Sequence, residues 1–171
     1  MLTLRRKRQI LPLFCKNYAV NCVIEITSYE RRKPKRRLMM KNFNWNVRVY
    51  YEDTDAGGIV FYANYLKFFE RARTEWLRAT GIHQQELKQT HEVMFVVKAS
   101  TVEYHAPARL DDELRITAVV EKLGRASILF AQEAWCGERL LASGTIKVGC
   151  VGANSLRPAA IPDVVVEKIH T

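Results

Sequence analysis

Three carboxylates and a glycine pair stand close together within residues 50–65, and their spacing could support acyl transfer. Glu52, Asp53 and Asp55 precede Gly57-Gly58, and aromatic residues then follow at a spacing typical of a helix. A helix N-terminus offers unpaired N–H donors and partial positive charge, which suit a developing oxyanion. A carboxylate just before such a helix could act as nucleophile or base while the helix amides polarise a carbonyl.

Other interpretations compete for the same residues. The carboxylates could cap the helix or lie in a solvated loop, and spacing alone leaves that alternative open. Asp53 and Asp55 begin like a calcium loop, but the fifth position is Gly57 and the twelfth is Asn64, where a calcium loop needs an oxygen ligand and a bidentate Glu. The sequence holds no Walker-type phosphate loop, and its Cys and His residues are not spaced like zinc ligands.

The segments around these carboxylates predict a strand, a loop and a long helix. Residues 45–51 alternate between apolar and polar and indicate a strand. Residues 52–58 are acidic, end in two glycines and indicate a loop. From about Tyr62, apolar side chains recur every three or four residues up to Gly81, which is suited to end a helix. A further helical turn is expected over residues 84–89.

After residue 92 the hydrophobic period changes to two, which predicts four long strands. Residues 126–136 are apolar on both faces and therefore predict a central strand. Tight turns at Gly124 and Gly137 indicate antiparallel neighbours. The expected fold is α+β, with an antiparallel sheet wrapped around one long central helix, and a poorly regular stretch is expected at residues 157–162. The four strands are expected at residues 93–104, 114–120, 126–136 and 140–150.

The net charge of +9 belongs to the first forty residues. They hold eleven of the 27 Lys and Arg residues but only two of the 18 Asp and Glu residues, so the rest of the chain is neutral. A neutral globular part argues against a nucleic-acid-binding domain. We expect residues 1–40 to be a basic tail, either disordered or an upstream extension absent from the native protein, and residues 41–171 to be the folded domain. No stretch is apolar enough to span a membrane.

The motif that begins at Val47 resembles a known family. Residues 47–60, with Tyr65 and the run Phe69-Glu70-Arg71-Ala72-Arg73, closely resemble the hotdog-fold acyl-CoA thioesterases. The nearest group is the thioesterase associated with the Tol–Pal cell-envelope system, which is related to 4-hydroxybenzoyl-CoA thioesterase. Residues 102–104 and 107–112 match the second strand and turn of that group, and the resemblance runs from about Asn44 to Pro162.

The resemblance implies a catalytic residue and its partner. The second Asp of the Asp-Thr-Asp triplet is catalytic in this family, and here it is Asp55. The backbone N–H seven residues later holds the thioester carbonyl, and here it belongs to Tyr62, where many relatives have His. Gly58 is expected to bind substrate because its backbone can approach a ligand. Glu52 and Asp53 are expected to be structural, since a nearby carboxylate tends to raise its partner's pKa.

The implied activity is hydrolysis of acyl-CoA, with no cofactor and no metal, in a homo-oligomeric dimer or tetramer. A cytoplasmic location is expected, with peripheral contact at the inner membrane as an option. An acyl carrier protein or envelope proteins are optional partners, and no nucleic-acid partner is expected. The rival interpretation is a non-catalytic acyl-binding or scaffold module of the envelope or phospholipid-synthesis machinery. Glu70 and Arg73 either pair along or beneath the helix or reach the substrate.

Overall fold

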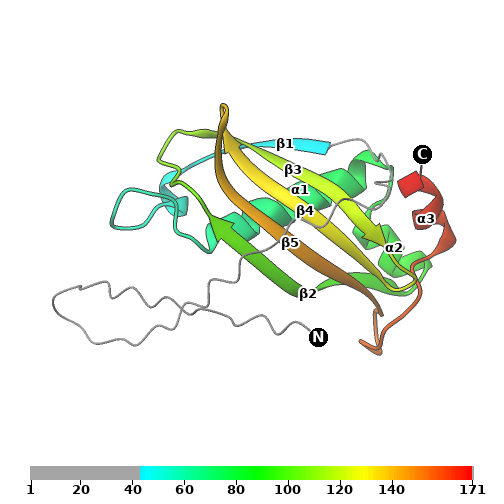
Figure 1. The fold of residues 1–171 in the computed structure, drawn as a ribbon. Coiled ribbons are helices and arrows are strands. Elements are labelled where there is room, and N and C mark those ends of the chain that lie inside the picture. The colour runs from blue at the N-terminus through cyan, green and yellow to red at the C-terminus, as the bar shows by residue number, and fades with distance from the viewer. Residues whose placement is uncertain (1–42, 171) are drawn as a thin grey trace, which may run out of the picture. The chain divides into compact units, whose positions relative to one another are not determined.

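A computed structural model describes residues 43–170, which form an antiparallel sheet curved around a long helix (Figure 1). The basic segment 1–40 lies outside the described residues. The sheet order is β1-β3-β4-β5-β2, and every neighbouring pair is antiparallel. The expected α+β hotdog fold is therefore confirmed. The elements in chain order are β1 (Phe43–Arg48), the 3₁₀ turn η1 (Tyr51–Asp53), α1 (Asn64–Ala79), α2 (Gln84–Thr90), β2 (Val93–Tyr104), β3 (Glu113–Leu123), β4 (Ser127–Cys136), β5 (Arg139–Gly152) and α3 (Asp163–His170).

The strand β4 is central, as its two apolar faces predict. Short turns join it to β3 and β5, so these three strands are sequential neighbours. The strand β2 behaves differently, because it pairs with β5 at the sheet edge and not with β3, the strand that follows it. Residues 105–112 connect β2 at this edge to β3, which lies next to the strand at the opposite edge. The outer side of β2 therefore has no partner strand within the described residues.

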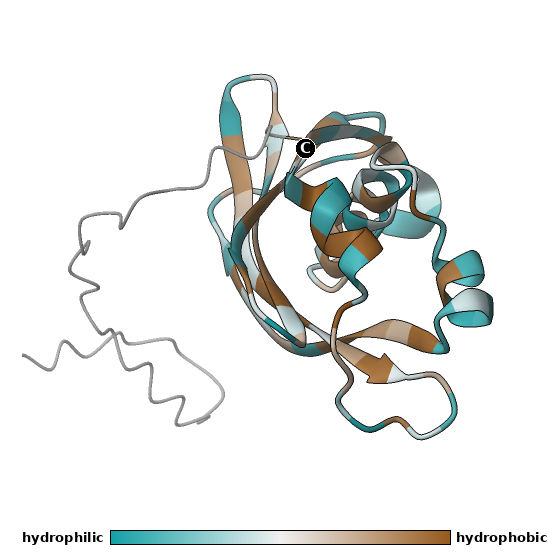
Figure 2. Cartoon of the chain, turned by 90° about the vertical axis from the view of Figure 1, so that its right-hand side faces the viewer, coloured by the Kyte–Doolittle hydropathy of each residue, from teal (hydrophilic) through white to brown (hydrophobic). Residues whose placement is uncertain are grey.

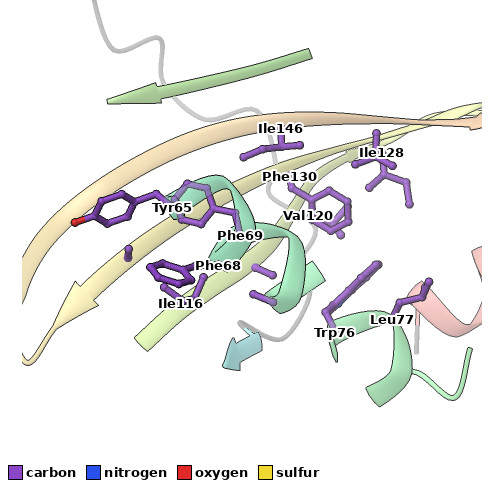
Figure 3. Packing of buried hydrophobic residues seen from close by; sticks show 14 of the residues in the cluster. Tyr65, Phe68, Phe69, Trp76, Leu77, Ile116, Val120, Ile128, Phe130 and Ile146 are labelled. Atoms are coloured by element: carbon purple, nitrogen blue, oxygen red, sulfur yellow. The ribbon is translucent and has the colours of Figure 1, made fainter. Parts of the chain in front are cut away.

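The core lies between α1 and the inner face of the sheet. Phe68, Phe69 and Ala72 of α1 are fully buried. The two phenylalanine rings pack toward Ile116 of β3 and Ile146 of β5 (Figure 3). Along the strands, hydrophobic and hydrophilic residues alternate (Figure 2), as a sheet with one covered face requires.

A glycine sets how closely the helix approaches the sheet. A Cβ added to Gly144 of β5 would lie 3.1 Å from the Cε2 atom of Phe69 and 2.9 Å from the carbonyl oxygen of Thr101. Any larger residue at this position would therefore push α1 away from β5.

Two expectations from periodicity need correction, and one helix was missed. The first strand ends at Arg48, because Val49 and Tyr50 leave the ladder and Tyr51 begins a 3₁₀ turn. The long helix begins at Asn64, two residues after Tyr62. The helix α3 was not predicted, since its run of three valines favours a strand locally, and it forms because Val165 and Ile169 are buried on one face.

Candidate active site

The loop between η1 and α1 is held by its own backbone. Thr54 and Val60 form an isolated antiparallel bridge that closes the loop at its base. Inside it, the Asp55 N–H donates to the carbonyl of Ile59 (2.9 Å), and the Gly58 N–H donates to the carbonyl of Asp55 (3.0 Å). Gly58 has φ +71°, a conformation that glycine adopts without steric cost, so the tight turn explains this residue.

The Asp55 carboxylate lies exposed at the start of this turn. Its Oδ1 atom accepts a hydrogen bond from the Gly57 N–H at 2.8 Å, and its Oδ2 atom bonds to nothing within residues 43–170. A Cβ at Gly57 would lie 3.0 Å from Oδ1, so a side chain there would crowd the carboxylate. The second glycine, Gly58, faces open space, since an added Cβ would meet nothing within 4 Å. One carboxylate oxygen is therefore fixed and the other is available.

Asp53 has the opposite environment, two residues earlier. Its side chain is only 2% exposed, and its Oδ2 atom accepts a hydrogen bond from the Tyr50 N–H (3.0 Å). Its carbonyl accepts from the Phe61 N–H and from the Asn64 side-chain amide, both at 2.9 Å. Asp53 therefore ties both ends of the loop together, which agrees with the expected structural role.

The first turn of α1 has no side-chain cap. Its N-cap residue is Ala63, no side chain bonds there, and no acidic residue occupies the first turn. The alternative that the carboxylates cap this helix is therefore wrong. The Tyr62 N–H, in the turn just before α1, makes no hydrogen bond within the part of the chain that the structure describes. Such an open donor, near the positive end of a helix, suits an oxyanion or a polarised carbonyl.

Aromatic side chains surround this end of α1, and most are exposed. The Tyr104 hydroxyl donates to the carbonyl of Tyr62 (3.1 Å), and their ring centroids lie 6.2 Å apart. The Tyr65 hydroxyl accepts from the Ala108 N–H (3.1 Å), and burial raises the pKa of this phenol, so it stays protonated. Phe61, Tyr62 and Tyr104 of this group are exposed, and so are Tyr50 and Tyr51 at the start of the preceding loop.

A second site lies along the other half of α1. Glu70, Arg73, Trp76 and residues of β2, β4 and β5 line a cavity of about 90 Å³. Arg73 donates to the Oε1 atom of Gln132 (2.6 Å), while Glu70 accepts from Thr74 (2.7 Å). Glu70 and Arg73 form no ion pair with each other. The expectation that they pair along or beneath the helix is therefore wrong. Burial lowers the pKa of Arg73, and the nearby Glu70 opposes that effect.

Sequence analysis missed Gln132, which holds α1 to the sheet. It is 1% exposed, and its Nε2 atom donates to the carbonyls of Phe69 (3.0 Å) and Thr117 (3.2 Å). A polar residue at an inward position of the central strand is the signal that could have revealed it, because a buried amide must find partners.

Comparisons with known proteins agree with this fold. The family model of the thioesterase-like superfamily matches residues 49–169. An acyl-CoA thioesterase YbgC of Haemophilus influenzae is 43% identical over 133 residues, which cover 78% of this chain and 98% of that protein. An acyl-CoA thioester hydrolase YbgC of Escherichia coli O157:H7 is 47% identical over 127 residues, or 74% of this chain and 94% of that protein.

A probable thioesterase from Bartonella henselae has a similar solved structure. It is 31% identical, covers 71% of this chain and 99% of its own, and superposes with a TM-score of 0.68. The fold and the loop before α1 thus define a hotdog protein of the thioesterase class. This chain belongs to the thioesterase-like superfamily and is an enzyme of that class. Among the residues that the structure describes, no helix is long and apolar enough to cross a membrane.

Proposed function

We propose that this enzyme hydrolyses acyl-CoA thioesters to the free acid and coenzyme A, with Asp55 as its catalytic residue. The observation that carries the proposal is one loop that presents both an unbonded carboxylate oxygen of Asp55 and the open N–H of Tyr62. The names of the two YbgC relatives support the choice of an acyl-CoA substrate.

In the proposed reaction, the Tyr62 N–H binds the thioester carbonyl oxygen and stabilises the charge that develops on it. Asp55 then acts in one of two ways. As a nucleophile, its carboxylate attacks the carbonyl carbon, the C–S bond breaks, the thiolate takes a proton, and water hydrolyses the anhydride. As a general base, it takes a proton from a water molecule that attacks the carbonyl directly.

The glycines and Asp53 have supporting roles in this proposal. Gly57 leaves space for the Asp55 carboxylate, and Gly58 leaves the backbone open where the pantetheine arm of the substrate would pass. The buried Asp53 fixes the loop on which Asp55 lies. The Tyr62 position supplies a backbone donor, so the change from His to Tyr there leaves this donor in place.

The proposed active unit is a homo-oligomer, at least a dimer. One side of the 12-residue β2 is unpaired within residues 43–170, and this strand carries two exposed apolar side chains, Val96 and Val97. Long exposed edges invite pairing with another chain. A second copy that pairs its own β2 antiparallel to this one would continue the sheet and cover these exposed apolar side chains of β2. Light scattering that gave a monomer mass at micromolar concentration would contradict this arrangement.

A thiol-release assay tests the proposed activity. Purified enzyme is mixed with acyl-CoAs of different chain length, including an aromatic one, and free coenzyme A is measured with a thiol reagent. We expect turnover of at least one substrate above the uncatalysed rate. Binding of acyl-CoA without turnover of any substrate would favour the scaffold interpretation and contradict the proposal.

The finer expectations that come from the resemblance remain predictions. They are the 4-hydroxybenzoyl-CoA subgroup, a cytoplasmic location, association with the Tol–Pal system, and contact with an acyl carrier protein or the inner membrane. An assay with acyl groups on purified carrier protein, next to the same acyl-CoAs, measures the carrier preference directly.

A further inference from the structure

The carbonyl of Tyr62, just before α1, lacks the backbone partner that a regular helix would give it. In an α-helix each carbonyl accepts a hydrogen bond from the N–H four residues later, which here belongs to Leu66. The Leu66 N–H donates instead to the carbonyl of Ala63 (3.1 Å). The chain enters the helix through a tight turn, in which the Asn64 N–H donates to the carbonyl of Phe61 (2.9 Å). No backbone N–H of the described residues bonds to the Tyr62 carbonyl.

Tyr104, at the end of β2, supplies the missing donor. Its hydroxyl donates to the Tyr62 carbonyl at 3.1 Å, although the two residues are 42 positions apart in the sequence. The backbone of Tyr104 pairs with Ala142 in the ladder between β2 and β5. The next N–H, that of His105, donates to the carbonyl of Leu141 (2.8 Å). The group that holds the Tyr62 carbonyl is therefore fixed to the sheet and does not belong to the catalytic loop.

The ring of Tyr104 is itself held by its neighbours. It packs edge to face against the rings of Tyr62 and Tyr65, with centroids 6.2 Å and 5.7 Å away. Tyr65 is in turn bonded to the segment after β2, because its hydroxyl accepts a hydrogen bond from the Ala108 N–H (3.1 Å). Burial raises the pKa of the Tyr104 phenol, so this hydroxyl is a protonated donor at neutral pH.

Two peptide planes meet at the Cα atom of Tyr62, and together they set the direction of its N–H. The first plane contains the Tyr62 N–H and the Phe61 carbonyl, and the Asn64 N–H holds it. The second plane contains the Tyr62 carbonyl, and the Tyr104 hydroxyl holds it. Without that hydroxyl, the second plane would be free to turn its carbonyl toward water, and the first plane would lose part of its constraint. Hydrogen bonds weaken steeply when the donor is misaligned.

We propose that Tyr104 is a positioning residue of the reaction, whose hydroxyl holds the Tyr62 peptide so that its N–H stays aligned with the thioester carbonyl oxygen. The inference rests on the proposed function, in which this N–H binds that oxygen, and it adds to the site a residue from outside the loop. Tyr104 acts through the backbone of Tyr62 and does not contact the reacting atoms.

Tyr104→Phe tests the proposal, because it removes the hydroxyl and keeps the ring with its two aromatic contacts. We expect kcat for acyl-CoA hydrolysis to fall about tenfold, which is part of the roughly 10²–10³-fold that loss of a whole oxyanion donor costs. KM should stay within about twofold, because the affected hydrogen bond strengthens as charge develops in the transition state. The melting temperature should change by a few degrees at most, since the lost hydrogen bond is exposed.

Tyr51→Phe is the matched control at the same end of the molecule. The Tyr51 side chain is 82% exposed, and its hydroxyl makes no hydrogen bond among the described residues. Loss of this hydroxyl should leave kcat, KM and the melting temperature as in wild type.

Infrared spectroscopy separates positioning from mere structural support. The probe is an unreactive ketone analogue of the acyl-CoA, in which a methylene group replaces the thioester sulfur and the carbonyl carbon is ¹³C. An aligned hydrogen bond polarises the bound carbonyl and lowers its stretching frequency. We expect the same frequency in wild type and Tyr51→Phe, and a higher frequency in Tyr104→Phe. A role confined to stability would leave this frequency unchanged.

A double variant identifies which part of Tyr62 receives the effect. If the Tyr104 hydroxyl acts through the Tyr62 carbonyl, Tyr104→Phe should reduce kcat by the same factor in wild type and in a Tyr62→Phe background. A loss that disappears in that background would assign the effect to the Tyr62 phenol and overturn the proposal.

The outcomes separate this inference from the proposed function. If the wild-type enzyme hydrolyses no acyl-CoA, the proposed function fails and the inference fails with it. If wild type is active and Tyr104→Phe matches it in kcat and in carbonyl frequency, only the Tyr104 assignment is overturned. A fall in kcat with an unchanged carbonyl frequency, or with a large loss of melting temperature, would show a structural role and would also overturn the assignment.

Discussion

The two ends of α1 are treated differently by the chain around them. At the C-terminal end, backbone N–H groups of Thr80, Gly81 and Ile82 donate to the last carbonyls of the helix, and the Lys168 ammonium of α3 donates to the carbonyl of Gly81 (2.8 Å). At the N-terminal end, no side chain caps the helix, and the Tyr62 N–H makes no hydrogen bond within the described residues.

This difference shows which end of α1 keeps a backbone hydrogen-bond donor available to a ligand. Unsatisfied donors at a helix end cost stability unless water or a ligand completes them, and folding could have capped this end as it capped the other. Asp53 and Asp55 lie close by in the sequence, yet one bonds to the 3₁₀ turn and the other to Gly57. The open end therefore fits a binding role for the substrate carbonyl, and the closed end serves the fold.

The largest expected effect comes from the carboxylate at the open end. Asp55→Asn keeps the size of the side chain but removes its charge and basicity. We predict that kcat for acyl-CoA hydrolysis falls at least about 10²-fold, in the range that positioned acid–base groups contribute. KM should change little, and the melting temperature should hold or rise, since functional groups are often kept at a cost in stability.

Asp53→Asn is the matched control two residues away. Because Asp53 is buried and bonds to the Tyr50 N–H, we expect a loss of about 1–2 kcal/mol in the free energy of unfolding. The change in kcat should stay within about tenfold. Urea denaturation and the thiol-release assay measure the two effects. A dead Asp53→Asn beside an active Asp55→Asn would show that the catalytic assignment is wrong by two residues.

At the closed end, Gly81→Ala should affect stability alone. Gly81 has φ +75°, which an alanine adopts only with strain, and an added Cβ would lie 3.4 Å from the Lys168 Nζ atom. We expect the free energy of unfolding to fall by about 1 kcal/mol, with unchanged kcat. A Gly81 variant that lost activity but kept its stability would remove the distinction between the two ends.

Tyr62→Phe should have a small effect. The proposed contribution of Tyr62 is its backbone N–H, which every residue except proline retains. We expect kcat within about threefold of wild type, which is under 1 kcal/mol in the barrier. A much larger fall would move the role from the backbone to the phenol group, and steady-state kinetics on the same acyl-CoA decides between them.

The smallest effect is expected at the N-terminus. Residues 1–40 hold all of the net charge of the chain, and the family match begins at residue 49. A protein that starts at Met40 should hydrolyse acyl-CoA as fast as the full chain and melt within a few degrees of it. A large loss of stability on truncation would contradict this prediction and show that residues 1–40 contribute to the folded domain.

Local patterns in the sequence predicted most of the fold. The alternation over residues 93–104 matches β2 at both ends, and the helical period ending at Gly81 matches the end of α1. The place of β2 at the sheet edge was not predictable, because strand order depends on contacts between distant residues. The helix α3 was hidden for the same reason, since its local preference is for a strand and its burial is tertiary.

The candidate site was predicted from the motif more than from spacing. The resemblance identified Asp55, Gly58 and Tyr62, and their catalytic and binding roles stay predictions, while the structure adds the free Tyr62 N–H and the fixed Asp55 carboxylate. The cavity around Arg73 could not be predicted. It depends on Gln132, which comes from a strand nearly sixty residues later in the chain, and on Phe95 and Val97 of β2, which line the same cavity.

The most direct test of the central claim is an NMR measurement of the backbone amides at both ends of α1. ¹⁵N-labelled enzyme is titrated with a ketone analogue of the preferred acyl-CoA in which a methylene group replaces the thioester sulfur. The account predicts a large downfield ¹H shift of the Tyr62 amide as it bonds the analogue's carbonyl, with little change at Thr80 and Gly81. Saturating binding that leaves the Tyr62 amide unshifted would contradict the account.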